Sequence, residues 1–245
     1  MTLALTYTRL QLVEMLRTPV QFLTIVLTPV AVMIFFLVPN LGHDAEAMTG
    51  ATATMVVFAT LLACVGQYST TVAAMRESPW GAYLRTLPGG LAPQVVSNLV
   101  SGMVVVVAAV VPVVLAAALF TPATAAPARV AAAVAALLVA VVTFTMLGLA
   151  IGYTMSLRAT VLANSLLLLA LAVAGGMFSD PADTPALVGA VAPFVPTRGA
   201  TDLVLAALVD HPLDPTALVM LALWTIALGV VTVWGHRRDE GRRFD

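Results

Sequence analysis

Long apolar stretches separated by short polar segments run through the chain from residue 20 onward. Six of them contain no charged residue and cover 20–39, 51–74, 94–119, 130–155, 159–178 and 216–235. Each has about the 20 residues that a helix needs to cross a bilayer core of roughly 30 Å. Pro29 and Pro112 lie inside two of them, which membrane helices tolerate because neighbouring groups satisfy the freed backbone. The pattern predicts one all-α membrane domain over residues 1–245 with six transmembrane helices.

The segment before the first span, residues 1–19, carries Leu5, Leu12 and Leu16 on roughly one helical face. This predicts an interfacial helix that lies along the membrane surface. Arg9 projects within the apolar stripe and would have to extend its charge toward water. The alternative is a simple extension of the first span.

Residues 76–88 lie between the second and third spans and mix aromatic with charged side chains. Ser78-Pro79 has the pattern of a helix start, a cap residue followed by Pro. One interpretation is a short helix on the membrane face that docks another protein. The other is a loop in which Trp80 and Tyr83 sit at the membrane interface and the arginines only set the topology.

Residues 179–214 are too long for a simple connection and too apolar for a solvated one. Thr184-Pro185 can open a first short helix through residue 192. Pro193 and Pro196 then turn the chain, and a second short helix begins at Arg198. Neither helix can cross a bilayer, so we expect a re-entrant helical hairpin on the external side. An amphipathic external flap is the alternative.

Composition agrees with a membrane protein. Hydrophobic residues make up 61% of the chain and charged residues 9%, whereas soluble domains carry roughly 25% charged residues. The net charge of −1, without a basic stripe, excludes the electrostatic pattern of a nucleic-acid-binding protein.

The positions of the arginines predict the orientation. Nine of the eleven lie before span one, between spans two and three, between four and five, or after span six: Arg9, Arg17, Arg76, Arg85, Arg158, Arg237, Arg238, Arg242 and Arg243. By the positive-inside rule, both termini of this multi-pass protein of the cytoplasmic membrane lie in the cytoplasm. A signal peptide is the alternative for the first span, because Ala45-Glu46-Ala47 resembles a cleavage site; cleavage would leave five spans.

Candidate chemistry is sparse. The chain has no lysine and therefore no Walker A P-loop, so any ATP that drives it must be bound by another chain. No Asp, Glu or His falls within the six spans, so neither a catalytic group nor a metal cluster can form there. We expect no enzyme activity, no metal and no cofactor in this chain. Coupling to protons is also disfavoured, although backbone carbonyls could still bind Na⁺.

Neutral polar side chains do occur inside two spans. Gln67, Tyr68 and Thr71 lie in the second span, and Asn164 and Ser165 in the fifth. They could line a path for a bulky amphiphile. The alternative is hydrogen bonding between helices.

This order of elements resembles the ABC-2 family of membrane subunits, and the resemblance covers almost the whole chain. Arg76-Glu77 followed by Leu84, Arg85, Thr86, Leu87 and Pro88 is similar to the family's motif before the third span. The run from Ala192 to Gly199, with Pro193 and Pro196, is similar to the proline-rich turn before its last span. Ser78-Pro79-Trp80-Gly81 departs from the commoner Gly-Thr-hydrophobic pattern.

The resemblance implies the permease half of an ATP-driven exporter: two six-span subunits, identical or homologous, on two cytoplasmic ATPase subunits that bind ATP and Mg²⁺. It implies that a coupling helix at 76–88 receives the ATPase movement. The residues expected to transmit it are Arg76, Glu77, Trp80 and Arg85, with Arg9, Glu14 and Arg17. The expected substrate is an apolar or amphiphilic drug, antibiotic or lipid. A secondary transporter and a membrane scaffold or assembly protein are the competing hypotheses, and co-purification of a Walker-motif ATPase would separate them.

Overall fold

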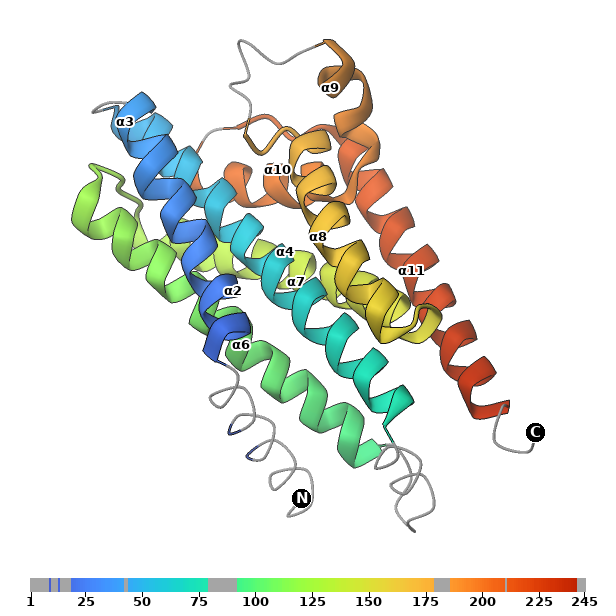
Figure 1. The fold of residues 1–245 in the computed structure, drawn as a ribbon. Helices are drawn as coiled ribbons and strands as arrows, with labels where there is room; N and C mark the ends of the chain where they lie inside the picture. Colours follow the sequence, from blue (N-terminus) through green and yellow to red (C-terminus); the bar gives the residue numbers. More distant parts are fainter. Residues whose placement is uncertain are drawn as a thin grey trace.

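The computed structural model describes residues 9, 13, 19–41, 44–78, 92–178, 186–209 and 211–241. Within these ranges the regular secondary structure is helical, without strands. Long helices pack side by side, and short ones gather at one end of the bundle (Figure 1). The predicted all-α membrane fold is confirmed.

The long helices match the predicted spans in order but not in their bounds. They are α4 (Ala45–Glu77), α6 (Ala92–Phe120), α7 (Pro127–Thr154), α8 (Leu157–Ala174) and α11 (Pro215–Gly241), preceded by α2 (Pro19–Val32), the π-helix η1 (Met33–Leu37) and α3 (Val38–Leu41). The short elements are α9 (Ala186–Val191), the 3₁₀ turn η2 (Ala192–Phe194) and α10 (Pro196–Leu208). The second span is the most extended relative to its prediction, because Asp44 caps α4 by accepting bonds from the amides of Glu46 and Ala47.

By length and composition, five of the described helices can cross a membrane: Ala45–Glu77, Val100–Phe120, Pro127–Thr154, Leu157–Ala174 and Pro215–Asp239. The apolar segment Leu23–Leu37 is shorter. It belongs to the run of α2, η1 and α3, which follow one another without a break and occupy the place of the predicted first span. The predicted interfacial helix lies outside the described residues, apart from the helical, exposed Arg9 and Val13.

Helix α4 is the centre of the bundle. It packs against α2, α6, α7, α8 and α10, and Figure 1 shows it between α2 and α8. Buried side chains occur along most of its length, including the fully buried Met48, Met55 and Leu61. A helix that is apolar on nearly all sides is typical of the interior of a bundle.

Glycine lets α7 approach α4 closely. A Cβ atom added at Gly148 would lie 2.9 Å from the carbonyl oxygen of Cys64, and one at Gly152 would lie 2.9 Å from that of Ser69. Small residues at such contacts allow two membrane helices to pack backbone against backbone.

The outer helices present apolar side chains to the surroundings. Leu119 on α6, Leu166 on α8 and Ile226 on α11 are 76%, 75% and 66% exposed. Water would disfavour such a surface and lipid would not. Threonines within the helices satisfy their hydroxyls internally: Thr52, Thr60 and Thr154 each donate to the carbonyl four residues earlier.

Candidate functional site

Arg76 sits in the last turn of α4, where it joins two other helices. Its Nε donates to Asp239 Oδ1 of α11 at 3.0 Å. Its Nη1 donates to the carbonyl oxygens of Gly152 and Met155, at the end of α7, at 2.8 and 3.1 Å. The side chains of Arg76 and Asp239 are 17% and 16% exposed, so this ion pair is largely withdrawn from solvent.

Glu77, the next residue, reaches a fourth helix. Its Oε1 accepts a bond from the amide of Leu157, the first residue of α8, at 2.9 Å. Ser156, the N-cap of α8, accepts from the amide of Ala159. Two of the amides that the start of a helix leaves without partners are therefore satisfied by side chains.

Together, Arg76 and Glu77 form a junction at the turn between α7 and α8. The guanidinium lies at the C-terminal end of α7 and the carboxylate at the N-terminal end of α8, and each charge has the sign that the helix dipole favours. We call Arg76, Glu77, Asp239 and the turn 152–157 the α4 junction. It connects α4, α7, α8 and α11 at the end of the bundle where α4 and α11 both finish (Figure 1).

The α4 junction covers only the start of the predicted coupling segment 76–88. Arg76 and Glu77 belong to α4 and Ser78 is its C-cap, whereas the residues that follow the predicted helix start at Ser78-Pro79 lie outside the described residues. Trp80, Arg85, Glu14 and Arg17 lie outside the described residues, and Arg9 is exposed. Asp239 was missed because the sequence offers no signal for a partner 163 residues away.

Asn164 is a buried link between α8 and α4. Its Nδ2 donates to Ser69 Oγ at 2.8 Å, and Ser69 Oγ lies 3.2 Å from Asn164 Oδ1. Ser69 is fully buried and Asn164 is 8% exposed. In this structure Asn164 therefore makes the interhelical hydrogen bond that was the alternative to a place on a substrate path.

The other neutral polar candidates differ in their surroundings. Gln67 donates to Thr71 at 3.2 Å along α4, and both are partly exposed. Tyr68 is buried against α6, where a Cβ atom at Gly102 would collide with its ring. Ser165 is exposed and donates to the carbonyl of Val161 within α8.

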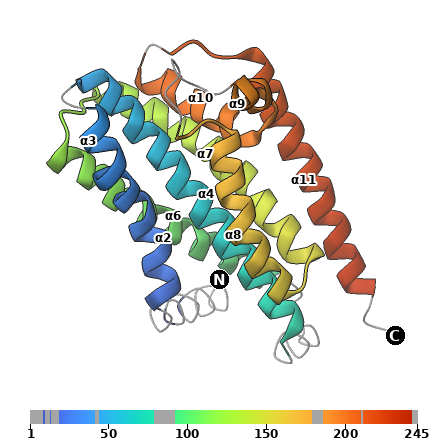
Figure 2. The same ribbon diagram turned by 45° about the horizontal axis from the view of Figure 1, so that its top comes forward.

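The segment predicted to form a hairpin contains α9, η2 and α10, in helix, turn and helix order. Pro193 lies in η2 and Pro196 begins α10. Helix α10 lies across the end of the bundle (Figures 1 and 2) and packs against α4, α7 and α11. Trp224 donates through Nε1 to the carbonyl of Phe194 at 2.8 Å. Because Trp224 lies about 13 Å along α11 from its start, the turn sits beside the body of α11 and not beyond its end.

The start of α10 also meets the end of α8. Thr197 donates to the carbonyl of Leu171 at 2.7 Å. A Cβ atom at Gly175 would collide with Thr197, so this glycine makes a close contact. Gly176 has φ of 74°, the left-handed conformation in which helices often end at glycine.

Asp202 of α10 is fully buried and was not singled out from the sequence. Arg198, one turn earlier, pairs with it at 3.0 Å, and His211 Nε2 lies 3.4 Å from its Oδ1. A buried carboxylate requires such a cation. Arg198, which was predicted to belong to the turn, therefore neutralises the buried charge of Asp202 within α10.

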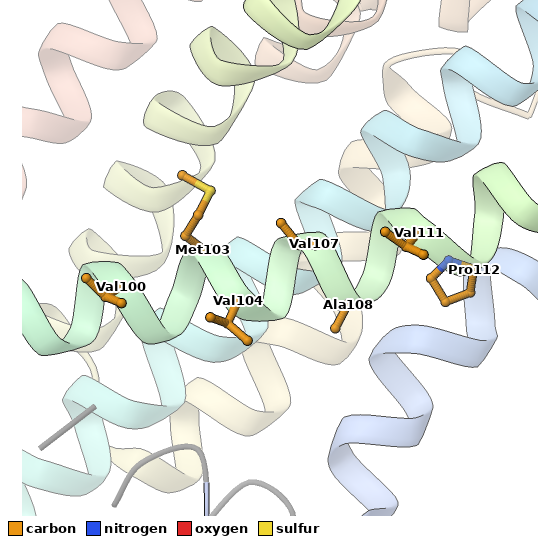
Figure 3. A pocket seen from close by; sticks show the side chains of 7 residues that line it. All are labelled: Val100, Met103, Val104, Val107, Ala108, Val111 and Pro112. Atoms are coloured by element: carbon orange, nitrogen blue, oxygen red, sulfur yellow. The ribbon is translucent and has the colours of Figure 1, made fainter. Parts of the chain in front are cut away.

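One groove lies on α6 and is lined by Val100, Met103, Val104, Val107, Ala108, Val111 and Pro112, with a volume of about 590 Å³. Figure 3 shows that all seven side chains come from this single helix. The lining is apolar, as expected for a surface that faces lipid chains.

Comparison with known proteins gives one result. A family model described as ABC-2 type transporter matches residues 2–209. No curated protein and no solved structure matches the chain.

Proposed function

Because this chain belongs to the ABC-2 type transporter family, as a membrane-embedded permease subunit, we propose that it is half of an ATP-driven exporter for apolar or amphiphilic compounds. The drug, antibiotic or lipid moves from the cytoplasm to the outside. ATP and Mg²⁺ bind to a separate cytoplasmic ATPase, and a second permease subunit completes the pathway.

The α4 junction is the observation that carries this proposal. Two adjacent side chains at the end of α4 hold the α7–α8 turn and α11 through the contacts of Arg76 and Glu77. A force applied to the segment that follows Ser78 would therefore move several helices together. In our proposal that segment binds the ATPase, and the junction transmits its movement to the spans.

The open side of α4 supports the proposed substrate class. Gln67, Thr70 and Thr71 are partly exposed and share one face of α4, many of whose other residues are buried. A neutral face with a few hydrogen-bonding groups suits a weakly polar molecule better than an ion. No Asp or Glu occurs from residue 78 to residue 179. We place the second subunit, and the substrate path between the two, against this side.

The arginine distribution supports a cytoplasmic position for the α4 junction and for both termini. The α9–α10 hairpin then lies on the external side. The bond from Trp224 to η2 supports a re-entrant position for it.

Co-purification tests the proposal. The tagged permease is expressed in its own host, solubilised in mild detergent and isolated with its bound proteins. We expect a Walker-motif ATPase in the complex. In inside-out vesicles that contain the complex, we expect ATP-dependent uptake of Hoechst 33342, a lipophilic dye, that stops with vanadate. Dye uptake without any requirement for an ATPase would overturn the proposal and favour a secondary transporter.

A matched pair of arginine variants tests the coupling role. Arg76→Gln removes the junction's cation, whereas Arg237→Gln removes an exposed arginine on α11 near the same end. We expect Arg76→Gln to lower dye uptake per ATP hydrolysed at least fivefold and Arg237→Gln to leave this ratio near that of the wild type. Equal ratios in the two variants would refute coupling through Arg76.

A further inference from the structure

Helix α11 docks along α7 through a continuous line of contacts. Thr225 shares a hydrogen bond of 2.7 Å with Thr143, and Thr232 donates to the carbonyl of Met146 at 3.2 Å. Gly235 packs against Tyr153, where an added Cβ atom would lie 2.8 Å from that residue's Cβ. These positions recur every three to seven residues along α11 and therefore share one face.

Asp239 continues this face by one more turn and reaches the α4 junction. Gly235 has no side chain, so α11 can lie close to α7 at this point. Asp239, one turn later on the same face, therefore has its carboxylate beside the end of α7. It accepts from Arg76 Nε at 3.0 Å while Nη1 of the same guanidinium bonds the α7 carbonyls. Nε and Nη1 lie in the rigid plane of the guanidinium, so a hydrogen bond that fixes Nε also fixes the direction in which Nη1 donates.

We propose that Asp239 is a positioning residue for Arg76, and that α11 is thereby a working part of the coupling junction. This inference rests on the proposed coupling role of Arg76. It extends the junction beyond residue 209, where the family match ends. Loss of the carboxylate leaves Arg76 charged but removes the bond that fixes Nε, so that only its bonds to the α7 carbonyls still orient it.

No neighbouring carboxylate on α4 can substitute for Asp239. Glu77 follows Arg76 directly, and adjacent side chains on a helix do not face each other. Glu77 is also engaged with the amide of Leu157. Orientation of Arg76 therefore depends on a residue of α11.

Hydrogen exchange on the isolated permease tests the positioning without an ATPase. We expect amides in the peptide 150–160 to exchange about fivefold faster in Asp239→Asn than in the wild type, because the end of α7 loses an ordered donor. Asp239→Glu, which keeps the charge, should restore slow exchange at least in part. The peptide 103–118 of α6 should be unchanged in every variant. Unchanged exchange at 150–160 in Asp239→Asn would overturn the proposal.

A double-mutant comparison shows whether Asp239 acts through Arg76. If it does, the amides of residues 150–160 should exchange equally fast in the Arg76→Gln variant and in the Arg76→Gln/Asp239→Asn double variant. Additive effects would mean that Asp239 acts by another route and would overturn the proposal. In the complex, Asp239→Asn should lower dye uptake per ATP and Asp239→Glu should recover it. If no ATPase co-purifies, the exporter proposal fails while the exchange measurements still decide the positioning role.

Discussion

Substitution of Gly152 by Ala tests the close packing of α7 on α4. The new Cβ atom would lie 2.8 Å from Val72 Cβ and 2.9 Å from the Ser69 carbonyl oxygen, whereas ordinary contacts lie at 3.4–4 Å. Both neighbours are attached directly to the α4 backbone, so they cannot rotate away. The two helices must separate by about half an ångström, and such overpacking typically costs about 1–3 kcal/mol.

Gly229→Ala is the matched control, because an added Cβ atom at Gly229 would meet nothing within 4 Å. Both substitutions replace a glycine inside a helix and gain about 1 kcal/mol of helix propensity. This gain cancels in the comparison. We therefore expect Gly152→Ala to be less stable than Gly229→Ala by about 1–3 kcal/mol.

The free energy of unfolding can be measured by adding sodium dodecyl sulfate to the protein in dodecyl maltoside micelles and following the far-ultraviolet circular dichroism. Equal free energies for the two variants would refute the close contact. Because the Gly152 carbonyl also accepts from Arg76, a displaced α7 should in addition accelerate amide exchange at the α4 junction.

Three further predictions concern single hydrogen bonds. In a double-mutant cycle, Ser69→Ala and Asn164→Ala should show a coupling of about 0.6 kcal/mol, the average for side-chain bonds between membrane helices, and at most about 1.7 kcal/mol. A coupling of zero would contradict the buried pair. Trp224→Phe should lower stability by about 0.5–1.5 kcal/mol, because a carbonyl of η2 loses its donor, and unchanged amide exchange in the hairpin would speak against this contact. Glu77→Gln should destabilise by about 0.3–1 kcal/mol at low salt and by less at high salt, because it removes a charge that favours the start of α8; an effect independent of salt would refute the electrostatic reason.

The order of helices could be predicted from the sequence, and their bounds only in part. The predicted second span, 51–74, is part of a helix that runs from Ala45 to Glu77. Residues 45–50 are less apolar than the span, so a hydropathy pattern omits them, whereas the cap at Asp44 and packing of Gly50 against Leu205 keep them helical. At the other end, the pattern places Arg76 and Glu77 in the segment after the span, because charge normally marks the end of a span, whereas in the structure they form the last turn of α4.

The residues of the candidate site, like the bounds of the helices, could be predicted from the sequence only in part. The sequence identified Arg76 and Glu77 as unusual, because charged residues beside a span are few and conspicuous. It could not identify Asp239, which lies in a tail with several charges that would ordinarily only mark the end of the last span. Nor could it decide whether Asn164 faces a substrate path or Ser69, since both interpretations need a polar residue in the same span.

The sequence by itself determined that lipid is the main solvent of this protein and that most of its length is helical. Both properties follow from the summed hydropathy of about 20 neighbouring residues, which can be read without knowing the fold. The sequence has no lysine and therefore no P-loop, which is why our proposal assigns ATP binding to a separate subunit. Only the tertiary structure decided which polar groups meet. A polar group that is withdrawn from water must find a partner within the protein. The partners of Arg76 and Asn164 lie 163 and 95 residues away in the sequence, where the local pattern carries no information.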